Sequence, residues 1–133
     1  MAFSLWTPEL SVGDRVLDAQ HEELFRTLNR VGEALRKGEA PATVERLLGY
    51  LVDHLHAHFE EEGRMMAGVG DPRAEQHQAA HERLLVRLRV FQVPGGPPFT
   101  QQVLIFLRAW MVDHFQKEDR PLVQQAKRIQ WAG

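Results

Sequence analysis

The sequence predicts an all-α protein, an up-down-up-down antiparallel four-helix bundle with an N-terminal arm and a short C-terminal helix. Three observations support this prediction. Apolar residues recur at alternating steps of three and four along four long segments, which is the spacing of one apolar stripe on a helix. Clusters of glycine and proline separate these segments. The alternation of apolar and polar residues that indicates β-strands does not occur.

The expected elements follow this punctuation in order. The arm covers residues 1–16, the helices cover about 17–37, 41–66, 72–91 and 98–118, and a tail helix covers about 121–130. Pro41 and Pro72 are expected in the first turns of the second and third helices, where a backbone N–H has no partner within the helix and proline therefore costs no hydrogen bond. Asp71 is expected to cap the third helix. Pro121 is expected to end the fourth helix because it disfavours helical geometry at Arg120. All 133 residues are expected to form one domain.

Composition excludes several classes of function. The chain is 44% hydrophobic and 26% charged, and its net charge of -2 argues against nucleic acid or an anionic membrane as partner. It has no cysteine, so any bound metal must be held by His, Asp or Glu. The first residues lack the pattern of a secretory signal, and no run of about 18 apolar residues occurs. We therefore expect a cytoplasmic protein without membrane insertion.

Five of the seven histidines occupy stripe positions where leucine is expected. They are His21, His58, His77, His81 and His114. A single histidine on an apolar face is usually a core residue with its own hydrogen-bond partner. Five of them would need five buried partners, and the sequence offers few Ser, Thr or Asn side chains for that purpose. Coordination of a shared metal satisfies all five at once.

Spacing extends this metal hypothesis to two carboxylates. His77 and His81 lie four residues apart, so both face one side of a helix. His58 and Glu62 have the same spacing, and Asp119 is the last acidic residue before the expected end of the fourth helix. Five imidazoles and two carboxylates exceed the positions of one first-row ion, which predicts a dinuclear centre bridged by carboxylates. The donors suit iron, zinc, copper or manganese without selecting one.

The carboxylate count indicates what kind of centre this is. Oxygen-activating di-metal bundles carry Glu-x-x-His twice, and this sequence has no such motif. Fewer carboxylates supply less negative charge to support a highly oxidised metal. The donor set therefore favours reversible ligand binding over oxidation of a substrate.

Several motifs in this order resemble those of the hemerythrin-like family, specifically its single-domain bacteriohemerythrins. They are Trp6 with Val12 and Gly13, "DAQH" at 18–21, "HFEEEGRMM" at 58–66, "HQAAH" at 77–81 and "WMVDHFQKED" at 110–119. Each motif alone is weak, but together they span nearly the whole chain.

The resemblance implies two iron ions joined by an oxo or hydroxo bridge. It implies that His77, His81 and His114 hold one ion, that His21 and His58 hold the other, and that Glu62 and Asp119 bridge them. One iron would keep an open position for O2.

The implied function is reversible O2 carriage, storage or delivery by a binding protein rather than an enzyme. Two alternatives stay open: an oxygen or redox sensing module acting through a partner, and peroxide or nitric oxide reduction. No protein partner is specified, and a monomer is compatible with the sequence.

Further residues are expected around this centre. Leu24, Phe59, Trp110 and Met111 are expected to line the O2 pocket, although plain core packing explains the same pattern. His54 is interpreted as a donor to a ligand, as a residue that tunes the redox potential, or as a partly solvated residue. Gly63 and Met111 depart from the family's usual residues. His56, Glu60 and Glu61 leave the stripe and are expected in solvent.

The spacing of the last two expected ligands conflicts with an ideal helix. His114 and Asp119 lie five residues apart, which is about 140° around an α-helix. They cannot both face one metal pair from a straight helix. We therefore expect a π-bulge or local unwinding between them, a feature that is frequent at functional sites.

Overall fold

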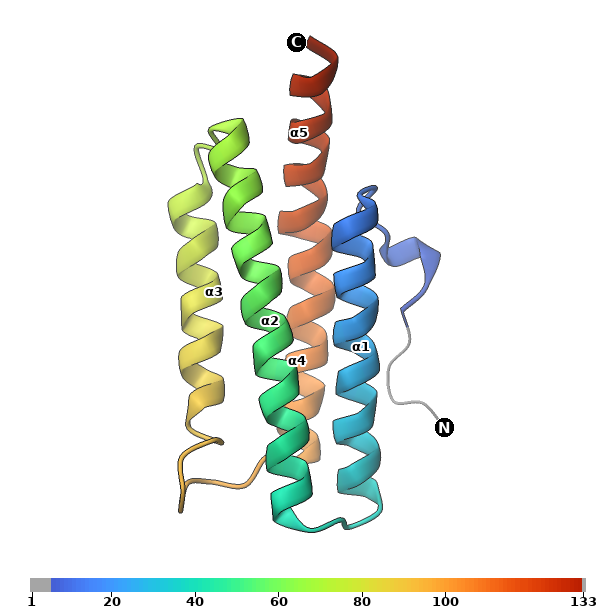
Figure 1. The fold of residues 1–133 in the computed structure, drawn as a ribbon, viewed down its shortest axis with the longest axis vertical. Helices are drawn as coiled ribbons and strands as arrows, with labels where there is room; N and C mark the ends of the chain where they lie inside the picture. Colours follow the sequence, from blue (N-terminus) through green and yellow to red (C-terminus); the bar gives the residue numbers. More distant parts are fainter. Residues whose placement is uncertain (1–5, 133) are drawn as a thin grey trace.

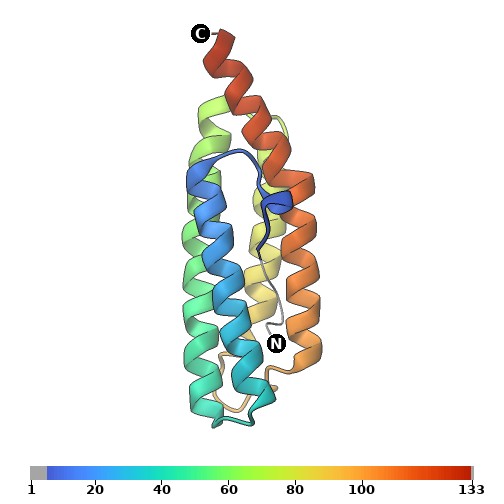
Figure 2. The ribbon, with the colours of Figure 1, turned by 90° about the vertical axis from the view of Figure 1, so that its right-hand side faces the viewer.

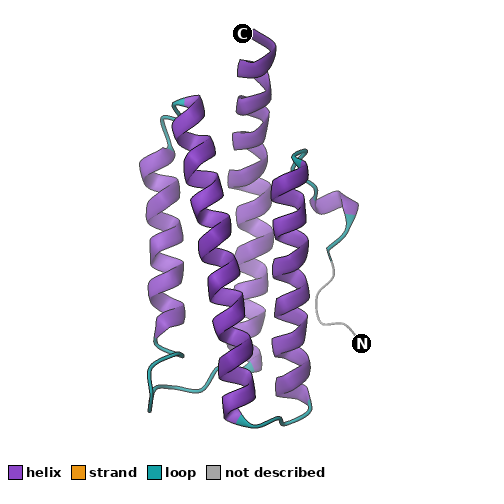
Figure 3. Ribbon diagram, in the orientation of Figure 1, coloured by secondary structure: helices purple, strands orange, loops and turns teal. Residues whose placement is uncertain are grey.

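Four long helices form an antiparallel up-down-up-down bundle (Figure 1). The structure is a computed structural model that describes residues 6–132, with side chains described as far as residue 129. Residues 1–5 of the expected arm and Gly133 lie outside the described residues. The helices are α1 (Arg15–Arg36), α2 (Pro41–Val69), α3 (Ala74–Arg89) and α4 (Gln101–His114). The described residues contain helices and loops but no strand (Figure 3), as predicted.

Capping residues define both ends of α1. The carboxylate of Asp14 accepts a hydrogen bond from the backbone N–H of Leu17 at 3.0 Å, which satisfies one of the unpaired donors of the first turn. At the other end Gly38 has φ of 67°, a left-handed conformation that L side chains rarely adopt. The N–H of Glu39 then reaches back to the carbonyl of Ala34 at 3.0 Å. The chain turns within four residues and α2 begins antiparallel to α1.

The loop between α2 and α3 differs slightly from the expected one. Pro41 begins α2 as predicted, and α2 runs to Val69, beyond the expected end at residue 66, before Gly70 terminates it with φ of 62°. Asp71 accepts a hydrogen bond from the N–H of Arg73 at 3.0 Å, so it closes a turn before the helix instead of capping it. For this reason α3 begins at Ala74 and not at residue 72.

The apolar stripes of the helices meet in one core. Fully buried leucines include Leu17, Leu24 and Leu28 of α1, Leu48, Leu51 and Leu55 of α2, Leu84 and Leu88 of α3, and Leu104 and Leu107 of α4. Burying one such side chain contributes about 1.5–3 kcal/mol relative to leaving it in water. The ligand-bearing segments are therefore held by packing along the length of the bundle.

The expected end of the fourth helix at residue 118 is wrong. After α4 the chain forms a π-helical segment, η2 (Phe115–Asp119), and continues directly into α5 (Arg120–Ala132), which extends past the end of the bundle (Figure 1). In the π-segment hydrogen bonds join residues five apart, as the bond from Arg120 N–H to the carbonyl of Phe115 shows. Pro121, which has no N–H, lies where the hydrogen-bond ladder changes register, so it does not break the helix.

The N-terminal arm folds back over the bundle. Its described part, from residue 6 on, contains the 3-10 turn η1 (Pro8–Leu10), and Trp6 packs against the core. Figure 2 shows the arm (dark blue) crossing from the start of α1 to the continuous helix formed by α4, η2 and α5 (orange to red). None of the helices in residues 6–132 combines the length and the apolar character needed to cross a membrane.

Candidate metal centre

The seven predicted metal-site residues lie together inside the bundle, toward the end at which α1 and α3 begin. His21 comes from α1, His58 and Glu62 from α2, His77 and His81 from α3, His114 from α4 and Asp119 from η2. Each is at most 5% exposed. Apart from Thr27, they are the only buried polar side chains among the residues that the structure describes. A polar cluster in so apolar a core is expected only where the groups satisfy one another or share a ligand.

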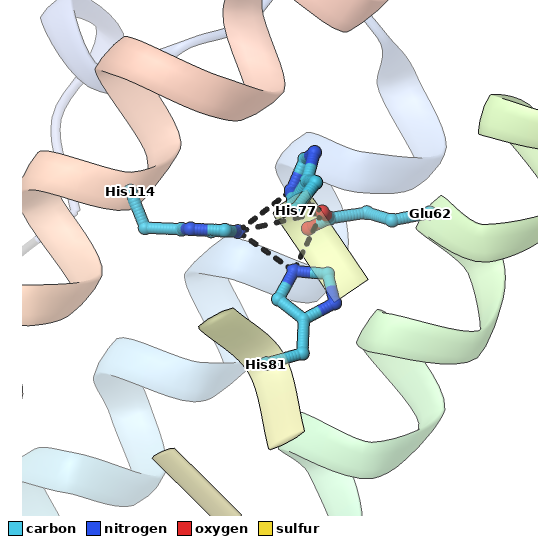
Figure 4. A group of neighbouring side chains, drawn as sticks. All are labelled: Glu62, His77, His81 and His114. Carbon is cyan, nitrogen blue, oxygen red and sulfur yellow. Dashed lines mark hydrogen bonds and ion pairs between the residues drawn. The ribbon is translucent and has the colours of Figure 1, made fainter. Parts of the chain in front are cut away.

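Three imidazoles converge on one side of this cluster (Figure 4). His77, His81 and His114 form what we call the three-histidine group. The Nε2 atom of His114 lies 3.1 Å from that of His77 and 2.9 Å from that of His81. The four-residue spacing on α3 brings the first two rings to one helix face, as predicted.

The other two imidazoles form the two-histidine group. The Nε2 atoms of His21 and His58 lie 3.0 Å apart, and both side chains are completely buried. This group is more deeply enclosed than the three-histidine group, whose members retain 4–5% exposure. The centre therefore has two unequal halves.

Each carboxylate presents one oxygen to each half. Glu62 Oε2 lies 2.8–3.4 Å from the Nε2 atoms of the three-histidine group, while its Oε1 lies against His58 Nε2. Asp119 Oδ1 lies 3.2 Å from His114, and its Oδ2 lies 2.9 Å from His21. The two halves correspond to two sets of possible ligands, Glu62 with the three-histidine group and Glu62 with Asp119 and the two-histidine group. Only Glu62 belongs to both sets, but Asp119 Oδ1 also lies 3.2 Å from His114 in the other half, a position from which both carboxylates could bridge two ions.

The donor atoms fit a pair of cations better than they fit one another. Glu62 Oε1 and Asp119 Oδ1 are buried beside imidazole nitrogens, yet neither oxygen accepts a hydrogen bond of good geometry from the described residues. Within each group, imidazole nitrogens face each other at about 3 Å, although a neutral imidazole has only one N–H to donate. Donors that share one ion with bonds of about 2.1 Å lie about 3 Å apart along an octahedral edge. Two cations would satisfy both the unpaired oxygens and the opposed nitrogens.

Both carboxylates are strongly biased toward the charged form. Burial raises the pKa of Glu62, but hydrogen bonds from the surrounding imidazoles, that of His114 foremost, hold this pKa well below its usual range. Burial and the charge of Glu62 likewise raise the pKa of Asp119, and hydrogen bonds from His114, His21 and His58 outweigh them and lower it. The centre therefore carries two negative charges that need compensation.

In the absence of a cation, protons on three histidines provide that compensation. Burial lowers the pKa of His58, but the two carboxylates outweigh burial and raise it to about 9. The same balance raises the pKa of His77 and of His114 to about 9. For His21 and His81 burial dominates, and their pKa values are lowered. A cation that binds here must displace protons, because only neutral imidazole is a ligand.

Aromatic rings stack flat on three of the five histidines. Phe59 lies parallel to His81 with ring centroids 3.8 Å apart. Trp110 lies parallel to His114 at 4.5 Å. These rings restrict rotation of the imidazoles and shield the donor atoms from water.

The third stacked ring belongs to a residue that the sequence interpretation missed. Phe115 lies parallel to His21 with ring centroids 3.5 Å apart, and it is fully buried. It follows His114 directly, and on a regular helix the two side chains would point about 100° apart. The available signal was the expected π-bulge, which changes the direction of the residues within it.

The other expected neighbours of the centre have mixed outcomes. Leu24 and Met111 are fully buried in the core, which agrees with a pocket lining and equally with packing. His54 is 45% exposed, and its Nε2 lies 4.0 Å from Glu23 of α1, so the structure favours its interpretation as a solvated residue. His56 is also exposed and pairs with Glu60 at 3.0 Å.

Gln20 is a second residue that the sequence interpretation missed. His58 Nδ1 and Gln20 Oε1 lie 2.7 Å apart, so the imidazole donates its Nδ1 proton to the amide oxygen. This hydrogen bond leaves the lone pair of His58 on Nε2, which points into the centre. Gln20 stood in the "DAQH" motif, but a glutamine one residue before a ligand has no role that spacing alone assigns.

The fold and the site define a class: a four-helix bundle whose core holds a candidate dinuclear cation centre of histidines and shared carboxylates. Comparison with known proteins agrees with this class. The family model described as the hemerythrin HHE cation binding domain matches residues 12–126, and the chain therefore belongs to the hemerythrin family.

Similar sequences and structures come from the same family. A bacteriohemerythrin of Stenotrophomonas maltophilia is 26% identical over 129 residues, which are 96% of this chain and 84% of that protein. A bacteriohemerythrin of Methylococcus capsulatus is 27% identical over 124 residues, 90% of this chain and 94% of that protein. The crystal structure of a hemerythrin mutant superposes with a TM-score of 0.88 at 25% identity, covering 95% of this chain and 98% of the other. Wild-type hemerythrin gives a TM-score of 0.83 over 90% and 94%.

Proposed function

We propose that this protein binds O2 reversibly at a pair of iron ions and serves in oxygen carriage, storage or delivery. One observation carries the proposal: two fully buried carboxylates each face both histidine groups, so three histidines and two histidines are available for two ions. In this assignment Glu62 and Asp119 would bridge the irons. The unequal number of histidines leaves the ion at His21 and His58 with fewer protein ligands, and so with room for O2.

The iron pair would supply the electrons for reversible O2 binding, and the protein would supply its surroundings. The three stacked aromatic rings and the leucines of the core keep bulk water away from the donor atoms. Exclusion of water and external protons matters because loss of reduced oxygen would leave an oxidised pair that no longer binds O2.

A binding protein is also what the family and the charge of the site support. The chain belongs to the hemerythrin family, and its function is therefore ligand binding rather than catalysis. Two carboxylates provide two negative charges, whereas the oxygen-activating bundles use more carboxylates and fewer histidines. The less negative site favours release of O2 over its use in oxidation.

An oxygen-exchange experiment tests this function. The protein is loaded with iron, reduced without oxygen and then exposed to O2 while the visible spectrum is followed. We expect an absorption band that appears with O2 and disappears when O2 is removed, over several cycles. Prompt conversion to a stable oxidised form that ignores O2 would contradict carriage and favour sensing or peroxide chemistry.

The hydrogen bond from His58 to Gln20 gives a second test. Replacing Gln20 with leucine keeps the size of the side chain but removes the acceptor, so the ring loses its fixed orientation. Loss of such an outer partner typically reduces metal affinity about 10- to 100-fold, and we expect a reduction in this range in a titration with Fe²⁺ under anaerobic conditions. Gln20→Glu retains an acceptor and should bind within a few-fold of the wild type. Unchanged affinity in Gln20→Leu would contradict the assigned role.

A further inference from the structure

Asp119 reaches the centre only because the helix is π-helical around it. On a regular α-helix Asp119 would point about 140° away from His114. In the structure it is the last residue of η2, and its Oδ1 lies 3.2 Å from His114 Nε2. A π-turn has poorer intrinsic stability than the α-helix around it, so contacts from outside the helix must favour it. The residues on either side of Asp119 make such contacts.

Arg120, the residue after Asp119, binds the N-terminal arm. Its guanidinium donates hydrogen bonds to the backbone carbonyls of Glu9 at 3.0 Å and Ser11 at 2.9 Å. Figure 2 shows the arm lying against the continuous helix formed by α4, η2 and α5. The two acceptors are separated by more than 100 positions in sequence from the donor, so this contact exists only in the folded chain.

The arm is in turn fixed to α1. Asp18 accepts hydrogen bonds from the Ser11 hydroxyl at 2.6 Å and from the Val12 N–H at 2.9 Å. Asp18 lies three residues before His21 on α1. Arg120 is therefore linked through the arm to the helix that carries part of the two-histidine group.

Glu118, the residue before Asp119, binds the start of α3. Both of its carboxylate oxygens accept hydrogen bonds from Arg73 Nη2, at 3.2 and 3.3 Å. Arg73 is the N-cap residue of α3 and lies four residues before His77. Arg73 is 58% exposed but Glu118 only 28%, and an ion pair that is partly open to solvent adds little to global stability. Its consequence is geometric, because it fixes the π-turn relative to the helix that carries the three-histidine group.

We propose that Arg120 and Glu118 are positioning residues for Asp119: they hold the π-turn between the N-terminal arm and the start of α3, and so keep the Asp119 carboxylate between the two histidine groups. The inference rests on the metal centre of the proposed function. It adds that the second cation depends on two contacts made by the partly buried side chains of Glu118 and Arg120, neither of which is itself a ligand.

Cobalt(II) titration of the full chain tests the proposal, because Co²⁺ reports its coordination through its visible spectrum. Arg120→Ala and Glu118→Ala are each expected to weaken binding of the second Co²⁺ about 10- to 100-fold, the range known for outer partners of metal ligands. The melting temperature of the metal-free chain should change by only a few degrees, since both side chains are partly exposed and lie outside the apolar core. Arg120→Lys, which keeps one donor group, should recover part of the affinity.

Two controls separate positioning from general destabilisation. Glu61 is a suitable control because it also comes directly before a carboxylate ligand, Glu62. It also pairs with an arginine, Arg64, but this pair lies within a regular helix. Glu61→Ala should therefore bind two Co²⁺ ions as the wild type does. Arg73→Ala should reproduce the effect of Glu118→Ala, and the double variant should be no weaker than either single variant.

The outcomes are distinct. Wild-type affinity in both Arg120→Ala and Glu118→Ala, or an equal loss in Glu61→Ala, would overturn the positioning role while the metal centre stands. A wild-type chain that binds no Co²⁺ would instead refute the metal centre itself. If Arg120→Ala fails to fold, Glu118→Ala alone decides, because it removes only the contact with Arg73.

Discussion

Replacing Glu62 with glutamine is expected to reduce iron binding from two ions per chain to at most one. Glutamine has nearly the same shape, but it is neutral and offers a single oxygen, whereas Glu62 presents one oxygen to each histidine group. The affinity lost should exceed the roughly 100-fold that follows from loss of an outer partner, since a direct ligand is removed. Iron content after anaerobic loading and gel filtration measures this, and the O2-dependent visible band should be lost with it.

Neighbouring side chains on the same helix supply the controls. Glu60→Gln removes an exposed carboxylate that pairs with His56, and His54→Ala removes an exposed imidazole one turn before His58. Both variants should load two irons and show the same band. Two irons bound with wild-type affinity in Glu62→Gln would remove the bridging role. Loss of both irons in His54→Ala would overturn the ligand assignment as a whole.

The sequence was sufficient to predict the fold and to collect the candidate ligands, because both depend on local periodicity. Leucines at steps of three and four place one face of each helix in the core, and a histidine in such a stripe must enter the core with them. His77 and His81 illustrate this: their spacing alone puts both rings on one face of α3, and the structure brings their Nε2 atoms to within about 3 Å of His114. The π-helical segment was also predicted, from the mismatch between the positions of His114 and Asp119.

The features that sequence reasoning missed depend on tertiary contacts. Pro121 was expected to end a helix, yet the π-segment before it shifts the hydrogen-bond pattern so that α4 and α5 are continuous. Gln20 became significant only when α1 packed beside α2 and brought its amide to His58. The bonds from Arg120 to the arm join segments more than 100 residues apart. No local pattern contains this information.

Removal of the metal is expected to have the second largest effect, a fall in thermal stability of about 20 °C or more. A ligand that binds only the folded state stabilises it by about 4 kcal/mol at a concentration 1,000 times its dissociation constant. Two such ions give about 8 kcal/mol, and each kcal/mol shifts the melting temperature of a domain of this size by roughly 3–5 °C. Calorimetry of the iron-loaded and chelator-treated protein, both under anaerobic conditions, measures the difference.

The difference in melting temperature between the iron-loaded and metal-free protein should also depend on pH, in a direction that the histidine and carboxylate pKa values determine. In the metal-free chain the folded-state pKa values of His58, His77 and His114 are raised from 6.5 to about 9. Their contribution to stability is complete below pH 6.5 and is lost as pH rises through 9. The lowered pKa values of Glu62 and Asp119 act at the other end, where stability is lost as pH falls below about 4.5.

Two histidines act against this trend on the acidic side. The lowered pKa values of His21 and His81 favour unfolding as pH falls below 6.5, so the stability of the metal-free chain should be greatest near pH 6. Folding raises the pKa of His58 from 6.5 to about 9, and the contribution of one such histidine to the free energy of unfolding falls by on the order of 3 kcal/mol as pH rises. The metal-free melting temperature should therefore fall by roughly 10 °C or more between pH 6.5 and 9.

The iron-loaded protein should not show this fall, because cations occupy the lone pairs that protons hold in the metal-free chain. Metal binding at pH 7 then displaces protons from the centre, and affinity rises with pH. The gap between the melting temperatures of the loaded and metal-free forms should consequently widen from pH 6.5 to 9.

Parallel curves of melting temperature against pH for the two forms would mean that the histidines do not exchange protons for metal. A gap that narrows would contradict the charge balance assigned to Glu62 and Asp119. Glu62→Gln provides the decisive comparison, since without this carboxylate the histidine pKa values are not raised as far and the metal-free chain should lose less stability above pH 6.5.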